Sequence, residues 1–276
     1  MNKKFHKFYI KLKETINIPE MSILPGQLAF FLLLSIIPLF ALIGVIATRF
    51  NISITSIIDT FSNNLPKEVS DFLLDITKGK SINFNVVVFC ISAFILASNG
   101  PNSMIIGSNM LYKIDNKDKL YRRVKAILMT IVLVILFLFV LLVPAFGDQI
   151  IKLIENSIDN KNINNTVTIV YSILKYPVSI FIIYFFIKLL YVMAPDKPIK
   201  SKTTTKGALF TTLGWIISTE IYSFYVRDFA HYNILYGSVG NLIILFLWIY
   251  ILSYIFVLGM ALNATNYNEK KINQVE

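Results

Sequence analysis

The stretch Tyr236-Gly237-Ser238-Val239-Gly240, and the apolar run that follows it as far as Asn263, decides the fold of this chain. No charged side chain occurs between Val239 and Ala264. A helix over those residues would be about 39 Å long, which exceeds the ~30 Å thickness of a bilayer's hydrocarbon core. The stretch therefore predicts a membrane-spanning helix.

The composition of the whole chain agrees with this prediction. Hydrophobic residues make up 55% of the 276 residues and charged residues 15%, and the mean hydropathy is +0.65. These values lie outside the range of soluble domains and predict an integral membrane protein. The single cysteine, Cys90, lies in an apolar segment and carries no information about the redox compartment.

Five further apolar segments resemble the first. The sequence predicts an all-α fold, a polytopic helical bundle with six membrane spans over residues 28–48, 84–106, 126–146, 167–194, 207–226 and 239–264. Pro25-Gly26 is expected to break the chain before the first span, and an Asn-rich turn is expected before the fourth. Short amphipathic helices are predicted between spans one and two and after span three.

The ends of the chain are basic. Residues 1–25 have lysines and apolar residues at helical spacing, which predicts an amphipathic helix on an anionic leaflet. A basic tail that merely holds the N-terminus is the alternative. Seventeen Lys and Arg residues fall in the N-terminal segment, the alternate loops and the tail 266–276, against seven in the other loops. This asymmetry predicts cytoplasmic N- and C-termini.

Catalytic chemistry finds little support in the sequence. The only histidines, His6 and His231, lie in unrelated segments, and there is no zinc motif, phosphate-binding glycine loop or nucleophile elbow. The largest acidic group comprises Asp59, Glu68, Asp71 and Asp75. Its periodicity favours a solvated helix face over a metal site. We therefore predict no enzyme activity, catalytic residue, metal or cofactor.

Charges within the spans are more informative, because each is costly unless it is paired or hydrated. Lys175 in span four and Glu220 in span five are predicted to lie at similar depth, roughly 10 Å inside the external boundary. We hypothesise that they pair or share a water-filled cavity. Independent snorkelling to the surface is the alternative.

Residues that break helices give a second indication of a substrate pathway. Pro38, Gly100-Pro101 and Pro177 interrupt spans one, two and four, and polar residues accompany two of these breaks. Broken helices are common around transporter sites, although kinks that only shape packing are the alternative. The hypothetical substrate pathway comprises Lys175, Glu220, Ser35, Pro38, Asn99, Gly100, Pro101 and Asn102.

The basic loops predict contact with the lipid bilayer rather than with nucleic acid. The positive-inside rule accounts for most of their charge, and few aromatic residues accompany it. Anionic lipid headgroups are the expected partners at the cytoplasmic loops. A homo-oligomer or an envelope protein is a further possible partner.

Several motifs together resemble the YihY/BrkB family of membrane proteins. The first span carries the run Gly26–Pro38, and Lys206-Gly207-Ala208 opens the fifth. The family-motif positions in the last part of the chain are Tyr236, Gly237, Trp248, Tyr250, Gly259 and Asn263. The similarity covers roughly residues 7–265. One departure is Ala261, where the family commonly has an acidic residue.

The resemblance implies a multi-pass protein of the bacterial cytoplasmic membrane. Members carry the labels of virulence factor and ribonuclease, and some are associated with envelope-lipid transport. Our leading hypothesis is a transporter or exporter of a lipid-like or amphipathic envelope substrate. A non-transporting scaffold is the first alternative, and a membrane-associated ribonuclease is the second.

Overall fold

The computed structural model describes residues 10, 12–49, 84–136, 161–228 and 239–272, and all regular structure in these ranges is helical. The all-α prediction is thus confirmed for the described part of the chain. Helical residues also occur at 12–16 and 119–136. The long elements are α2 (Glu20–Arg49), α5 (Phe84–Ala97), α6 (Asn99–Tyr112), α8 (Lys161–Met193), α9 (Ser201–Asp228) and α11 (Val239–Ile272).

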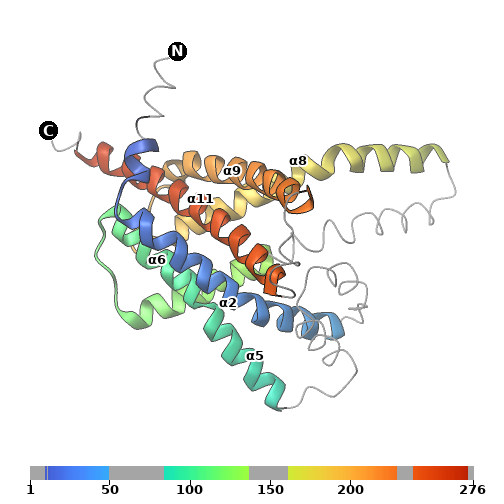
Figure 1. The fold of residues 1–276 in the computed structure, drawn as a ribbon, viewed down its shortest axis with the longest axis horizontal. Helices are drawn as coiled ribbons and strands as arrows, with labels where there is room; N and C mark the ends of the chain where they lie inside the picture. Colours follow the sequence, from blue (N-terminus) through green and yellow to red (C-terminus); the bar gives the residue numbers. More distant parts are fainter. Residues whose placement is uncertain (1–9, 11, 50–83, 137–160, 229–238, 273–276) are drawn as a thin grey trace.

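Helix α11 is the central element of the bundle. It packs against α9, α2 and α6, while α8 packs against α9 and α2 packs against α5 and α6 (Figure 1). The beginning of α2 and the end of α11 lie at the same end of the molecule (Figure 1). The apolar stretch after Val239, which decides the fold in the sequence, thus forms the helix that contacts α2, α6 and α9.

Three predicted helix boundaries were wrong. Helix α2 begins at Glu20 and runs through Pro25-Gly26, because a proline removes only one amide and the neighbouring Leu24 and Leu28 are buried. Helix α8 begins at Lys161, so the expected Asn-rich turn is helical. Helix α9 begins at Ser201 rather than at Gly207. The amphipathic helices predicted between spans one and two and after span three lie outside the described residues.

The two ends of the bundle differ in packing. At one end, hereafter the tight end, large side chains are fully buried, among them Tyr191, Phe256, Ile105 and Met129. The other end, hereafter the splayed end, includes residues 177–186 of α8 and 213–225 of α9, none of which is buried. The far ends of α5 and α8 diverge there (Figure 1).

Apolar side chains cover the outward face of α9. The exposed residues Leu209, Leu213, Ile217, Ile221 and Phe224 recur at helical spacing, whereas Thr204, Thr211 and Thr212 of the same helix are buried. Apolar side chains outside and polar side chains inside are the reverse of a soluble helix, and they fit a helix surrounded by lipid. Within the described residues, one stretch, Ile243–Asn268, is long and apolar enough to cross a membrane, with a hydropathy of 2.5.

Candidate functional site

The second predicted span is broken at Ser98. Helix α5 ends at Ala97 and α6 begins at Asn99, so the interruption is shorter than the sequence indicated. Pro101 has no amide to offer the carbonyl of Ala97, which weakens the helix at this point. The buried Ser98 hydroxyl donates to the Ile95 carbonyl at 2.6 Å. Backbone hydrogen bonds continue on both sides of the break, from the Ser98 amide to the Phe94 carbonyl at 3.1 Å and from the Asn102 amide to the Ser98 carbonyl at 3.0 Å.

An arginine from helix 119–136 contacts the break. Arg123 Nη1 donates to Asn99 Oδ1 at 2.7 Å, and Nη2 donates to the Ile95 carbonyl at 2.7 Å. The guanidinium thus bonds both sides of the break. Asn99 was predicted as a pathway residue, but its arginine partner was not. The polar run around Pro101, followed in the sequence by Arg122-Arg123, is the pattern that could have predicted this contact.

Three of the other predicted pathway residues directly follow Asn99, and Ser35 lies on the neighbouring helix α2. Gly100 and Pro101 are buried, and a Cβ at Gly100 would lie 3.7 Å from Phe31 and Leu32 of α2. The buried Ser35 hydroxyl donates to the Leu32 carbonyl of its own helix at 2.7 Å, and Asn102 is partly buried. These contacts indicate packing.

The predicted charge pair stays a prediction. Glu220 is exposed on α9, on the face that carries the apolar stripe. Lys175 and Pro38 have helical backbones within α8 and α2. The structure does not describe the placement of their side chains. The distance between the Lys175 and Glu220 side chains is therefore not part of the described structure.

Asn263 of α11 contacts Gly207 of α9 where the two helices cross. Asn263 Oδ1 accepts the Gly207 amide at 2.8 Å, and Asn263 Nδ2 donates to the Thr204 carbonyl at 3.2 Å. A Cβ at Gly207 would collide with the Gly259 carbonyl and the Asn263 amide. The two glycines let the helices approach closely, and the buried asparagine joins them.

A tyrosine from α8 completes this contact. The buried Tyr191 hydroxyl donates to the Phe256 carbonyl at 2.6 Å and lies 2.6 Å from Thr211 Oγ1. A Cβ at Gly259 would lie 2.6 Å from the same hydroxyl. We call Tyr191, Gly207, Thr211, Gly259 and Asn263 the seam, because these residues join α8, α9 and α11.

Aromatic side chains extend the α9–α11 contact toward the splayed end. Trp215 Nε1 donates to the Leu252 carbonyl at 2.9 Å, Trp248 Nε1 to Thr219 Oγ1 at 3.4 Å, and the Tyr222 hydroxyl to the Ile244 carbonyl. The predicted motif residue Tyr250 is partly exposed and stacks obliquely near Tyr254. Tyr236 and Gly237 lie outside the described residues.

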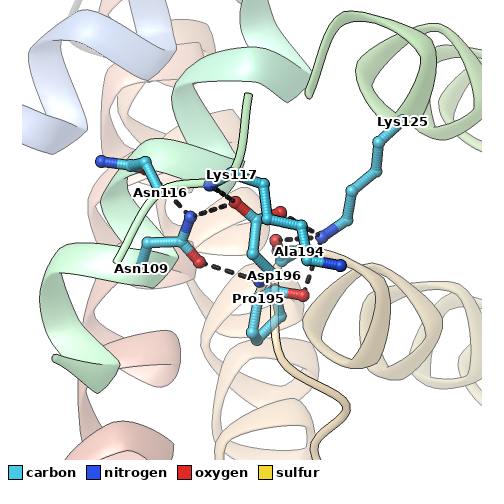
Figure 2. Close-up of polar contacts among 7 residues, drawn as sticks. All are labelled: Asn109, Asn116, Lys117, Lys125, Ala194, Pro195 and Asp196. Atoms are coloured by element: carbon cyan, nitrogen blue, oxygen red, sulfur yellow. Dashed lines mark hydrogen bonds and ion pairs between the residues drawn. The ribbon is translucent and has the colours of Figure 1, made fainter. Parts of the chain in front are cut away.

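A polar cluster at the tight end was missed by the sequence reasoning. Asp196, in the α8–α9 connection, is 4% exposed and accepts hydrogen bonds from Asn109 Nδ2 at 2.7 Å and Lys125 Nζ at 3.0 Å (Figure 2). Its carboxylate also accepts the Lys117 amide at 3.1 Å. Lys125 Nζ donates further to the carbonyls of Ala194 and Pro195 at 2.9 and 2.7 Å (Figure 2).

Local geometry explains how this cluster forms. Helix α6 ends at Lys113 in the left-handed conformation, which turns the chain back so that Asn116 reaches the Asn109 amide at 2.9 Å. The Asp196 amide donates to Asn109 Oδ1 at 2.8 Å, so the buried Asn109 bonds both connections. Burial alone would raise the pKa of Asp196, but the three hydrogen bonds and the Lys125 charge lower it below its ordinary range.

The described residues hold no group of three or more His, Cys, Asp and Glu side chains that could bind a metal ion. A small, mostly apolar crevice lies between α2, α6 and α11 at the tight end. It is lined by Leu24, Leu28, Ser103, Met104, Gly107, Val257 and Met260.

The apolar stretch Ile243–Asn268 and the exposed apolar face of α9 are typical of a helical membrane protein, and comparison with known proteins gives its family. The family described as Virulence factor BrkB matches residues 17–275. The chain therefore belongs to the BrkB family of membrane proteins.

Known relatives agree with this assignment. The chain is 29% identical to the ribonuclease-like protein YfkH of Bacillus subtilis strain 168, over 90% of each chain. It is 23% identical to a UPF0761 membrane protein of Vibrio atlanticus, over 87% of this chain and 75% of that one. A UPF0761 membrane protein of Pseudoalteromonas translucida is 32% identical over 28% of this chain and 25% of its own. No solved structure matches.

Proposed function

We propose that this BrkB-family protein is a transporter or exporter of a lipid-like or amphipathic substrate of the cell envelope. The observation that carries the proposal is the broken helix at Ser98, with the guanidinium of Arg123 bonded to both sides of it. Helices broken within a membrane are stable where neighbouring groups satisfy the freed backbone atoms. Such breaks commonly border the substrate sites of transporters.

The proposal includes six spans in the bacterial cytoplasmic membrane, with both termini inside the cell. The apolar outward stripe of α9 and the buried polar side chains of its inner face support a membrane setting for this helix. Reporter fusions can test the topology. Green fluorescent protein fused after Glu276 should fluoresce, and alkaline phosphatase inserted near Asn160 should be active. The opposite pattern would contradict the proposed orientation.

Transport itself is testable in proteoliposomes. Purified protein should move at least one member of a panel of fluorescent phospholipids and alkyl phosphates faster than protein-free vesicles do. Arg123→Ala should slow that movement at least tenfold, because it removes both hydrogen bonds to the break. Lys202→Ala, at an exposed position in the first turn of α9, is the control. A panel that shows no movement would contradict the proposal.

The pairing of Lys175 with Glu220 belongs to the same proposal. If the two charges meet, Lys175→Glu should reduce transport, and the added Glu220→Lys change should restore most of it. Double-mutant rescue is the standard measure of a direct pair. Failure of rescue in a well-folded double variant would contradict the pairing and leave the rest of the proposal intact.

A further inference from the structure

The guanidinium of Arg123 has unused hydrogen-bonding capacity. An arginine side chain carries five N–H groups. Within the described residues, Arg123 uses one hydrogen of Nη1 for Asn99 and one of Nη2 for the Ile95 carbonyl. Three of the five N–H groups therefore have no acceptor among the described residues and can bind a further one. Nε of the adjacent Arg122 is buried and also has no partner in the described part of the chain.

The charge of Arg123 is not neutralised by the described residues. The ion pair found there joins Lys125 to Asp196, and no described carboxylate lies within ion-pair distance of Arg123. The partners of Arg123 are an amide oxygen and a backbone carbonyl, both neutral. Such an arginine is suited to an anion, since the planar fork can bind a phosphate with two parallel hydrogen bonds.

The surroundings of this arginine are apolar and exposed. Ile95, whose carbonyl binds the guanidinium, is 45% exposed, and the next residue, Leu96, is 44% exposed. Leu120 and Val124, on either side of Arg123 in helix 119–136, are exposed too. A free phosphate ion has no apolar part that could contact these side chains, whereas the alkyl chain of an amphiphile can lie against them.

We propose that Arg123, bonded to the helix break, binds the phosphate headgroup of an anionic amphiphile whose alkyl chain lies against Ile95 and Leu96. This inference rests on the proposed transport function and names the chemistry of its substrate. Arg122 supplies a second positive charge from the adjacent position. The neutral contacts to Asn99 and the Ile95 carbonyl hold the guanidinium in place and leave its charge available to the headgroup.

The test measures binding in neutral detergent, so it does not depend on transport. Purified full-length protein is titrated with n-decyl phosphate, with inorganic phosphate and with the neutral decyl maltoside, and the melting temperature is recorded. Decyl phosphate should raise the melting temperature saturably, and the other two compounds should not. Arg123→Met should weaken decyl phosphate binding at least tenfold. Lys202→Met removes one charge from an exposed position in the first turn of α9 and should change it less than twofold.

Two conservative variants test the proposal if Arg123→Met does not fold. Arg123→Lys retains the charge but loses the planar fork, and should bind several-fold more weakly. Leu96→Asn leaves the arginine intact and should also weaken decyl phosphate binding. Equal binding by wild type and Arg123→Lys, or equal effects of inorganic and decyl phosphate, would overturn the proposal. Transport that persists when this site binds no decyl phosphate would refute the site alone.

Discussion

The tight and splayed ends of the bundle differ in which side chains they bury and which they expose. At the tight end, Asn109, Asp196 and Asn263 are buried and bonded to other elements. At the splayed end, Ile217, Ile221 and Phe224 face outward. Lipid is as apolar as leucine, so apolar burial alone does not drive helices together in a membrane. The comparison indicates that hydrogen bonds and close helix approach add to apolar packing at the tight end, while apolar side chains of α9 face the surroundings at the splayed end.

The largest test of this comparison is removal of the Asp196 carboxylate. Asp196→Ala leaves the Lys125 ammonium without its anion and strips Asn109 of one acceptor. Breaking a buried ion pair costs about 3–5 kcal/mol. The free energy of unfolding, measured by steric trapping in bicelles, should fall by about that amount. Asp115→Ala, on the exposed connection nearby, should change it by less than about 0.5 kcal/mol. Equal effects would contradict a special role for the cluster.

A smaller effect is expected at the seam. Gly259→Ala places a Cβ 2.6 Å from the Tyr191 hydroxyl, at a crossing that cannot widen without loss of the Asn263 bonds. Overpacking of this kind costs about 1–3 kcal/mol. Gly26→Ala is the matched control, because its Cβ would meet Tyr250 at 4.0 Å. Equal melting temperatures for wild type and both variants in a thermal-shift assay would contradict the close approach of α9 and α11 at Gly259.

The hydroxyl of Tyr191 is expected to contribute less again. Tyr191→Phe removes the bonds to Phe256 and Thr211 but keeps the ring, and Thr211 retains the Ile255 carbonyl at 3.4 Å as an acceptor. The loss should be about 1 kcal/mol. Tyr121→Phe, on an exposed residue, should have no measurable effect on the unfolding free energy. A larger loss for Tyr121→Phe than for Tyr191→Phe would contradict the stabilising role of the Tyr191 hydroxyl.

Much of the helical architecture could be predicted from sequence. The apolar run after Val239 predicted a helix there, since an uncharged stretch of that length has few other structures, and α11 continues past the predicted end at residue 264 to Ile272. The break near Gly100-Pro101 was also visible, because proline removes an amide wherever it stands. The predicted helix boundaries were wrong near Pro25 and Lys161. The helices there include a Pro-Gly pair and an Asn-rich segment that, by local sequence alone, predict a break or a turn.

The candidate site was predicted less well, for a physical reason. Asn109 and Asp196 are 87 residues apart in sequence, and each alone resembles an ordinary polar residue at a helix end or in a loop. Their importance comes from burial at a shared contact, which no local pattern encodes. Asn263 and Gly259 were singled out from the family resemblance, but their contact with Gly207 required the crossing of α9 over α11.

The smallest expected effect concerns the pH dependence of stability and tests the tight end alone. Because the folded-state pKa of Asp196 is lowered, its stabilising contribution is fully present above the ordinary value of 3.8 and is lost as pH falls through the lowered pKa. The difference in unfolding free energy between wild type and Asp196→Asn should therefore be constant from pH 8 to about pH 5. A difference that shrinks over this range would mean that Asp196 takes up a proton there. The hydrogen bonds from Lys117, Lys125 and Asn109 would then not outweigh the burial of the carboxylate.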